Sequence, residues 1–311
     1  MKLAFVFPGQ GSQSVGMLDS FQDNATVQAV LAQANEALGE DLVKLIHEGP
    51  AEELNLTVNT QPALLTASTA MYEAWKAQGG PIPSVMAGHS LGEYSALTAA
   101  GVFSIPEAVK LVRFRAQTMQ NAVPVGVGGM AAILGLTDEV VQEVCQAASA
   151  HGVVEAVNFN SPGQVVIAGV KEAVEAACAM AKEKGAKRAL MLAVSAPFHS
   201  SMMKPAADAL RERLKATPMS KPAVDVIANI DVAVHAETDA IVEALAQQAA
   251  GAVQWVKTIE SFKAQGVTHV VEFGPGRVLA GLIKRIDSSI VVMNINSEES
   301  LQSVLAEVKA L

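Results

Sequence analysis

Short apolar runs, each stopped by glycine or proline, alternate along the chain with longer stretches whose apolar residues recur at helical spacing. Residues 3–7 stop at Pro8-Gly9, and residues 83–87 stop at Gly88. Apolar runs of this length between turn residues are typical of buried parallel strands. Helix-spaced patterns cover residues 25–38, 42–48, 61–78, 91–100 and 106–120, with Pro62 expected in the first turn of the third. Strands that alternate with helices predict an α/β protein built on a parallel sheet.

The middle of the chain has a different order of elements. Residues 124–129, Pro-Val-Gly-Val-Gly-Gly, resemble a linker and lack the Gly-x-Gly-x-x-Gly pattern of a dinucleotide site. After them we expect strand, helix, strand, strand, helix and strand at residues 131–136, 138–150, 153–159, 164–168, 171–184 and 188–194. This is the order of a ferredoxin-like unit. Because α/β segments precede and follow it, we predict a small inserted domain at 124–196 and a discontinuous core at 1–123 and 197–311.

The α/β pattern returns in the last third of the chain. We expect helices at 206–214, 240–249, 255–265 and 297–310, and strands at 224–229, 268–273 and 290–294. The turn Gly274-Pro275-Gly276 joins the strand ending at 273 to a helix that ends near 285. Such a turn at a helix N-terminus can bind a phosphate, although a tight turn alone explains the three residues.

Composition narrows the class of protein. Of the 311 residues, 50% are hydrophobic and only 4% aromatic, which suits a helix-rich α/β enzyme. The net charge of −9 argues against nucleic acid as a partner. No apolar run approaches the roughly 18 residues of a membrane span, and residues 3–7 are too few for a signal peptide, so we expect a cytoplasmic protein without membrane contact. Cys145 and Cys178 have no metal-binding spacing and are expected to be free thiols.

The strongest chemical signal is Gly88-His89-Ser90-Leu91-Gly92, between a predicted strand and a predicted helix. A Gly-x-Ser-x-Gly in this context is a nucleophile elbow, a sharp turn that exposes the serine hydroxyl. Strand and helix cross closely there, which leaves no room for a Cβ on Gly88 or Gly92. The N-terminus of the helix offers free N–H groups that stabilise a developing oxyanion. Ser90 is therefore the candidate nucleophile.

Three further positions have more than one interpretation. The turn at residues 8–13 is either structural or supplies a second oxyanion donor, the N–H of Gln10. His199 lies beside an aromatic residue at the expected domain junction, and structural and catalytic roles are equally supported. Arg113 and Arg115 are two residues apart on one predicted helix, so they point to different sides. An arginine on a helix is usually solvated, but one of these two can turn inward.

Several motifs occur in a fixed order along nearly the whole chain. They are Phe7-Pro8-Gly9-Gln10-Gly11-Ser12-Gln13, Gln61-Pro62-Ala63-Leu64, Gly88-His89-Ser90-Leu91-Gly92-Glu93, Arg115, Val157-Asn158-Phe159-Asn160-Ser161-Pro162-Gly163-Gln164, Phe198-His199 and Gly274-Pro275-Gly276. This ordered set resembles the malonyl-CoA:acyl-carrier-protein transacylases, the discrete acyltransferases of type II fatty-acid synthesis. The fold of that family is a hydrolase-like parallel-sheet core with an inserted ferredoxin-like α+β domain, which agrees with the insertion predicted above.

The resemblance implies roles for individual residues. Ser90 is implied to be the nucleophile, and His199 its general base and acid. The backbone N–H groups of Gln10 and Leu91 are implied to form the oxyanion hole. Arg115 matches the family arginine that holds the malonyl carboxylate, which reverses the usual expectation of a solvated helix arginine.

One segment departs from the family pattern. Gln248 falls where the family's histidine is oriented by a main-chain carbonyl instead of a carboxylate. The residues that follow, Ala249-Ala250-Gly251-Ala252, lack the bulky aliphatic-aromatic pair and the proline of the usual pattern. The resemblance therefore implies an orienting backbone carbonyl at Gln248 within an atypical segment.

The implied activity is ping-pong transfer of a malonyl group from malonyl-CoA to the phosphopantetheine thiol of acyl carrier protein, through a malonyl-serine intermediate. A coenzyme A thioester is then a substrate, and no tightly bound cofactor and no metal are expected. We also expect a monomer. An acidic carrier protein would dock on basic residues, although solvated helix ends also explain them. The candidates are Lys182, Lys184, Lys187 and Arg188 on the small domain, and Lys284 and Arg285 near the cleft.

Three other interpretations are open. A serine hydrolase or thioesterase with Ser90, Asp231 and His269 has the chain order of hydrolase triads, but His269 begins a predicted strand instead of following one. An acyltransferase serving polyketide synthesis would have similar motifs, although the absence of flanking linkers favours a stand-alone enzyme. A carrier-binding scaffold with a dead site conflicts with the intact serine, histidine and arginine.

Overall fold

The larger of two β-sheets forms the centre of the molecule in a computed structural model, which describes residues 1–194 and 196–311. It is parallel throughout, with strand order β7-β2-β1-β8-β9. The strands are β1 (Leu3–Phe7), β2 (Val85–Gly88), β7 (Asp225–Ile227), β8 (His269–Phe273) and β9 (Val291–Ile295). Parallel neighbours require crossover connections, which helices supply. The α/β class predicted from the alternating pattern is confirmed.

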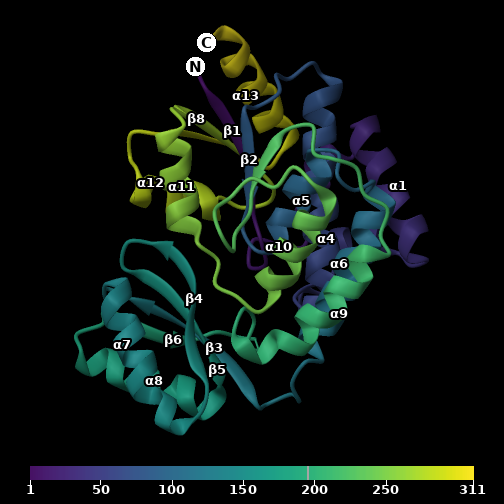
Figure 1. Cartoon of the computed structure of the whole chain (residues 1–311). Helices are drawn as coiled ribbons and strands as arrows, with labels where there is room; N and C mark the ends of the chain where they lie inside the picture. The colour runs from purple at the N-terminus through teal and green to yellow at the C-terminus, as the bar shows by residue number, and fades with distance from the viewer. Residues whose placement is uncertain (195) are drawn as a thin grey trace.

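Helices cover both faces of this sheet, with α11 and α12 on one side and α1, α4, α5 and α6 on the other (Figure 1). The helices of the core are α1 (Ala25–Leu38), α2 (Leu42–Glu48), α3 (Ala51–Leu54), α4 (Thr57–Ala77), α5 (Leu91–Ala99), α6 (Ile105–Gln120), α9 (Lys204–Lys215), α10 (Thr238–Ala249), α11 (Trp255–Ala264), α12 (Val278–Ile286) and α13 (Glu298–Ala310). The two termini lie close together at one end of the sheet (Figure 1).

The central strand β1 contributes to the apolar core on both faces. Phe5 and Phe7 belong to the cluster under α4, where the Phe5 ring lies 4.8 Å from that of Phe273. Ala4 and Val6 belong to the cluster under α11 and α12. Side chains alternate across a strand, so one continuous apolar run fills both cores.

The second sheet is antiparallel, with strand order β4-β5-β3-β6, and lies below the larger sheet in Figure 1. Its strands are β3 (Gly128–Leu134), β4 (Val154–Ser161), β5 (Gln164–Val170) and β6 (Arg188–Met191). The helices α7 (Asp138–Ala148) and α8 (Lys171–Glu183) pack against it. The element order is the predicted ferredoxin-like one, so the inserted α+β unit is confirmed as a fold, while its boundaries at 124 and 196 stay a prediction.

Short backbone contacts join the second sheet to the core. The N–H of Phe159 on β4 donates to the carbonyl of Val253 at 3.1 Å, and the N–H of Val253 donates to Val157 at 2.8 Å. His89 Nε2 lies 2.7 Å from Asn160 Oδ1 at the end of β4. These contacts bring the motif of residues 157–164 beside the serine turn.

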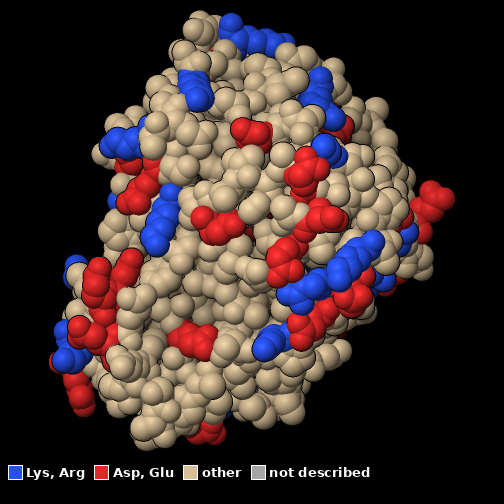
Figure 2. Space-filling model, viewed as in Figure 1, with Lys and Arg blue, Asp and Glu red and all other residues tan. Residues whose placement is uncertain are grey.

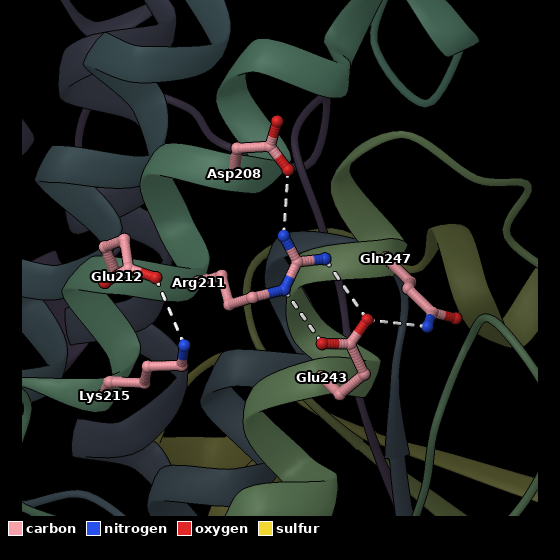
Figure 3. A network of polar contacts seen from close by, with 6 residues as sticks. All are labelled: Asp208, Arg211, Glu212, Lys215, Glu243 and Gln247. Carbon is pink, nitrogen blue, oxygen red and sulfur yellow. Dashed lines mark hydrogen bonds and ion pairs between the residues drawn. The ribbon is translucent and has the colours of Figure 1, made fainter.

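The helices α9 and α10 are joined by the ion-pair network in Figure 3. Arg211 Nη1 lies 2.9 Å from Asp208 on its own helix, and its Nε lies 2.8 Å from Glu243 on α10. Glu243 also accepts a hydrogen bond from Gln247 at 2.8 Å. Exposed pairs of this kind stabilise little individually, but the network links the C-terminal turns of α10, which carry Gln248, to α9.

The predicted start of the helix at residue 61 was wrong, because α4 begins four residues earlier, at Thr57. Pro62 therefore lies inside the helix and removes one backbone donor. The helix continues through it because α4 is buried along most of its length, and packing outweighs one lost hydrogen bond.

The glycine run at 124–129 is not only a linker, because Gly128 and Gly129 belong to β3. A Cβ on Gly128 would lie 2.4 Å from the Pro197 ring, so only a glycine at this position lets β3 lie so close to Pro197. The strand expected at 188–194 ends at Met191, and residues 192–194 leave the sheet to line a cavity. Sequence periodicity does not register this change, since the residues remain apolar.

Candidate active site

The serine turn has the backbone strain of a nucleophile elbow. β2 ends at Gly88, α5 begins at Leu91, and Ser90 between them has φ 51° and ψ −109°. A Cβ on Gly88 would lie 1.8 Å from the carbonyl oxygen of Gly92, and one on Gly92 would lie 2.0 Å from the oxygen of Phe7. The two glycines are therefore required by the close crossing of strand and helix. A non-glycine residue at positive φ is rare, and such residues cluster at functional sites.

A cavity of about 600 Å³ opens over Ser90. The core contributes Gln10, Gln61, His89, Leu91, Arg115 and His199 to its lining, and the second sheet contributes Met130, Asn158, Asn160 and Val166. The cavity is a cleft between the two sheets, at the carboxyl ends of β1 and β2 where α/β folds bind their ligands.

The chain holds His199 within hydrogen-bond distance of Ser90. Its Nε2 lies 2.7 Å from Ser90 Oγ, and its Nδ1 lies 2.7 Å from the backbone carbonyl of Gln248. A carbonyl only accepts, so Nδ1 carries the hydrogen and Nε2 is free to accept the serine proton. The His199 N–H donates to Ala249 O at 3.2 Å, and the residue has φ 66°. The atypical segment after Gln248 therefore still contacts the histidine through its backbone.

Burial keeps His199 neutral. The residue is 4% exposed, and burial, with a smaller contribution from the Arg115 charge, lowers the pKa of His199 from 6.5 to about 3. The imidazole is therefore unprotonated near neutral pH, and its Nε2 has a free lone pair.

Arg115 turns inward, and Arg113 turns outward. Arg115 is 1% exposed, and Arg113 forms an ion pair with Glu40 near the surface. Arg115 Nη1 donates to Gln61 Oε1 at 2.7 Å, and Nη2 donates to Gln248 Oε1 at 2.8 Å. Nη2 also lies 3.1 Å from Ser90 Oγ. Burial lowers the pKa of Arg115, but a guanidinium stays charged in proteins, so a cation faces the nucleophile.

Two backbone donors are available for an oxyanion. Gln10 and Leu91 line the cavity, and among the described residues no hydrogen bond uses the N–H of either. Leu91 is the first residue of α5, where the helix dipole adds partial positive charge. The Gln10 side chain donates to Thr57 at 3.0 Å, which holds its turn against α4.

Asn229 and Glu93 belong to the site, and sequence reasoning assigned a role to neither. Asn229 Oδ1 accepts the N–H of Ser90 at 2.8 Å, and its Nδ2 donates to Gly88 O at 2.7 Å. Glu93 Oε2 accepts the N–H of Asn229 at 3.1 Å and the Nε2 of Gln248 at 2.8 Å. Asn229 follows β7, the neighbour of β2, so the shared edge of the sheet was the available signal for it.

Glu93 is a buried carboxyl group in the first turn of α5 and is 2% exposed. Burial raises the pKa of Glu93 from 4.5 to about 7, although hydrogen bonds from Asn229 and Gln248 oppose the shift. A glutamate at this depth has an energetic cost, which suggests that it is retained for its contacts.

The alternative triad of Ser90, Asp231 and His269 was wrong. His269 pairs with Leu3 at the amino ends of the strands, whereas Ser90 lies beyond their carboxyl ends. Asp231 pairs with His235 at 2.9 Å. A parallel sheet separates its two edges by the length of the strands, so the order of residues along the chain alone was misleading.

The candidate docking residues lie at the surface. Lys182, Lys184, Lys187, Arg188, Lys284 and Arg285 are all exposed. Arg285 donates to Gln164 at 3.0 Å, which connects α12 to the small sheet. On the face shown in Figure 2, basic and acidic side chains are interspersed, so this face has no continuous basic surface.

Within residues 1–194 and 196–311, no group of three or more His, Cys, Asp and Glu side chains is arranged to hold a metal ion. In the same ranges no helix is both long and apolar enough to cross a membrane. Cys145 and Cys178 are buried free thiols.

Comparison with known proteins places this geometry in a family. Residues 4–307 match the acyl transferase domain family. The chain is 53% identical over 305 residues to the malonyl CoA-acyl carrier protein transacylase of Escherichia coli K12, covering 98% of this chain and 99% of that one. The Bacillus subtilis transacylase is 44% identical over 310 residues, covering 99% and 98%.

Solved structures agree with the sequences. The acyl-carrier-protein S-malonyltransferase of Burkholderia pseudomallei superposes with a TM-score of 0.97 at 61% identity, covering 98% of this chain and all of that one. A malonyl-transacylase solved with its type II PKS acyl-carrier protein has a TM-score of 0.97 at 48% identity, covering 99% of this chain and all of that one. The inserted-sheet fold, the strained serine and the full-length matches lead to one conclusion: the chain belongs to the malonyl CoA-acyl carrier protein transacylases, a family of acyltransferases.

Proposed function

We propose that this enzyme transfers a malonyl group from malonyl-CoA to the phosphopantetheine thiol of acyl carrier protein, through an ester on Ser90. The observation that carries the proposal is the position of one hydroxyl. Ser90 Oγ lies 2.7 Å from the base His199 and 3.1 Å from the buried cation of Arg115. An acyl group formed on that oxygen, with a carboxylate two carbons away, is within reach of the guanidinium.

The first half-reaction forms the malonyl ester. His199 Nε2 accepts the Ser90 proton as Oγ attacks the thioester carbonyl carbon. The N–H groups of Gln10 and Leu91 stabilise the tetrahedral oxyanion. The C–S bond then breaks, and His199 returns the proton to the departing sulfur, which releases the coenzyme A thiol.

The second half-reaction reverses these roles. His199 accepts the proton of the incoming pantetheine thiol, and the sulfur attacks the ester carbonyl. The same two N–H groups stabilise the second oxyanion, the C–O bond breaks, and Ser90 recovers its proton from His199. The carbonyl of Gln248 keeps the imidazole in one tautomer throughout.

Arg115 gives the site its preference for a substrate with a free carboxylate. A guanidinium can form two parallel hydrogen bonds with a carboxylate, and a lysine ammonium cannot. The groups now bonded to Arg115 are neutral, two glutamine oxygens and one hydroxyl, so its charge is available to a substrate.

The proposal includes the biological setting. Malonyl-CoA enters as a substrate and free coenzyme A leaves as a product. The enzyme uses no tightly bound cofactor and no metal. The acyl carrier protein that accepts the malonyl group is the carrier of fatty-acid synthesis. The enzyme itself is cytoplasmic and monomeric, and it binds neither membrane nor nucleic acid. A carrier of polyketide synthesis is the second candidate, because one solved relative is bound to its type II PKS acyl-carrier protein. The exposed Lys187 and Arg188, which lie where α8 is connected to β6, are proposed docking charges.

Intact-protein mass spectrometry tests the proposal. Incubation with malonyl-CoA should add one malonyl mass to the wild type and none to Ser90→Ala. Adding carrier protein bearing phosphopantetheine should remove the adduct and load the carrier. A Ser90→Ala protein that still becomes malonylated, or an adduct released only as free malonate, would contradict the proposal.

A further inference from the structure

Arg115 has a buried carboxyl group close by to which it donates no hydrogen bond. Its guanidinium donates to Gln248 Oε1 at 2.8 Å, and the Nε2 of the same amide donates to Glu93 Oε2 at 2.8 Å. The three side chains are almost fully inaccessible to solvent, at 1% for Arg115, 0% for Gln248 and 2% for Glu93. The side-chain amide of Gln248 therefore lies between the Arg115 guanidinium and the Glu93 carboxyl group.

We propose that Glu93 is a positioning residue for malonyl transfer, which fixes the amide of Gln248 so that the amide holds Arg115 beside Ser90. The inference rests on the proposed function, because it concerns the arginine proposed there to bind the malonyl carboxylate. We call the three residues the Glu93–Gln248–Arg115 relay.

Hydrogen-bond chemistry determines the direction of the relay. A carboxylate only accepts hydrogen bonds and a guanidinium only donates them. Nε2 of Gln248 donates to Glu93 and also to the carbonyl of Ser90, at 2.9 Å. The amide oxygen must then face the other way, toward Arg115. With the amide reversed, its NH₂ would oppose the guanidinium and its oxygen would oppose two acceptors.

The same carboxylate also supports the nucleophile turn. Glu93 Oε2 accepts the N–H of Asn229, whose side chain binds the backbone of Gly88 and Ser90 on both sides of the turn. Glu93 thus contacts neither His199 nor the cavity in which the substrate would bind. It is hydrogen-bonded to Gln248 and Asn229, which hold Arg115 and the serine turn. Burying a carboxyl group is costly, and the relay accounts for its presence.

The first test replaces the acceptor without shortening the side chain much. Glu93→Met should lower the malonyl-to-acetyl ratio of kcat/KM by about tenfold, because Arg115 loses its fixed partner while acetyl transfer has no carboxylate to bind. Glu93→Gln keeps an oxygen that can occupy the place of Oε2, and should restore most of the ratio. A merely structural residue would not alter the ratio between two substrates of one folded enzyme.

The second test removes the middle of the relay. Gln248→Met retains the backbone carbonyl that orients His199 but has no amide, so it should lower the ratio as Glu93→Met does. The double variant Glu93→Met/Gln248→Met should have the same malonyl-to-acetyl ratio as Gln248→Met alone, because the effects of residues that act through one another do not add.

A second buried glutamate supplies the control. Glu272 is 0% exposed and accepts the N–H groups of Leu279 and Ala280, at the start of α12. Glu272→Met should lower the melting temperature and leave the ratio at the wild-type value. A ratio that falls equally in this variant would mean that any buried charge loss disturbs the site.

The outcomes separate this inference from the proposed function. If Arg115→Ala changes the ratio but Glu93→Met does not, or if the double variant is additive, the positioning role is overturned. If Arg115→Ala leaves the ratio unchanged, the proposed carboxylate contact itself fails. If Glu93→Met does not fold, Gln248→Met decides alone, and a wild-type ratio in that variant overturns the relay.

Discussion

Two strand–turn–helix junctions flank the central strand β1, and only one of them has a strained serine that faces a histidine. β2 leads through Ser90 into α5, and β8 leads through residues 274–276 into α12. Each has a buried glutamate beside the helix start, Glu93 in one and Glu272 in the other. Burial raises the pKa of both carboxyl groups to about 7.

The junctions differ in what occupies the helix N-terminus. At α12, Glu272 accepts the N–H groups of Leu279 at 3.1 Å and Ala280 at 2.8 Å, so the protein's own carboxylate already fills the anion site. This favours the structural interpretation of Gly274-Pro275-Gly276 over a phosphate site. At α5, Glu93 bonds Asn229 and Gln248 instead. Leu91 lines the cavity, and among the described residues its N–H has no hydrogen-bond partner, so it is available to an oxyanion.

The turn of the second junction still serves the first. Gly274 has φ 151°, and a Cβ there would lie 2.5 Å from Pro8. The turn therefore packs against the Pro8-Gly9 turn that carries Gln10. Two similar local motifs in one sheet thus differ in use, one as the proposed reaction site and one as a turn that packs against it.

The largest effect is expected from removing His199, the proposed base, which lies beside the first junction only. His199→Ala should slow both half-reactions by about 100-fold or more, because among the described residues no other group bonded to Ser90 Oγ can accept its proton. Stopped-flow measurement of enzyme acylation and carrier loading checks this. His269→Ala, at the opposite edge of the sheet, is the matched control, and an equal loss there would contradict the assignment of His199 as the base.

The next effect concerns the cation of the first junction. Arg115→Ala should lower malonyl transfer by about 10-fold to 100-fold, with acetyl transfer falling much less. Arg115→Lys should recover little, because an ammonium cannot reproduce the two-pronged contact. The measurement is the malonyl-to-acetyl ratio of kcat/KM. Arg113→Ala should leave that ratio nearly unchanged, and an unchanged ratio in Arg115→Ala would mean that the arginine does not read the carboxylate.

A smaller effect is expected at the second junction. Glu272→Ala leaves two N–H groups of α12 without their acceptor and should cost about 1–3 kcal/mol of unfolding free energy. Chemical denaturation measures the loss, and the activity of the folded fraction should stay near the wild-type value. A large loss of activity without loss of stability would show that the two junctions are not as separate as their contacts indicate.

The pH dependence of stability provides the finest comparison. The pKa of His199 falls from 6.5 to about 3 on folding, so the unfolded chain binds the proton more tightly and stability decreases as the pH falls below 6.5. The pKa of Glu272 rises from 4.5 to about 7, so its contribution is present below 4.5 and is lost as the pH rises through 7. Each group changes stability by at most ~1.4 kcal/mol per pH unit.

Variants at the two junctions should therefore shift the pH of maximal stability in opposite directions. His199→Ala should move it toward acid, and Glu272→Gln should move it toward alkaline pH. Denaturation midpoints between pH 4.5 and 8 measure both shifts. Shifts of the same sign would contradict the assignment of the two buried groups.

The sequence by itself determined the local geometry of the nucleophile and the order of elements. The Gly-x-Ser-x-Gly pattern predicts the turn at Ser90, and for Gly88 the constraint is local, because a Cβ there would meet the backbone of Gly92 in the next helix. The spacing of apolar residues predicted the parallel core and the inserted sheet, because side-chain period follows directly from backbone geometry. The resemblance to a family then assigned His199 and Arg115, which periodicity left undecided.

Only the tertiary structure decided which buried polar groups meet. The contacts of Glu93 with Asn229 and of Ser90 with Gln248 join residues 136 and 158 positions apart. The pattern of apolar residues states which face of a helix is buried, but it does not state what that face contacts. A buried donor or acceptor must find a partner, and the partner is whichever group the packing of distant elements brings within 3 Å or so. For that reason the sequence alone does not show that Glu272 caps α12, whereas Glu93 bonds Asn229 and Gln248 beside the serine turn.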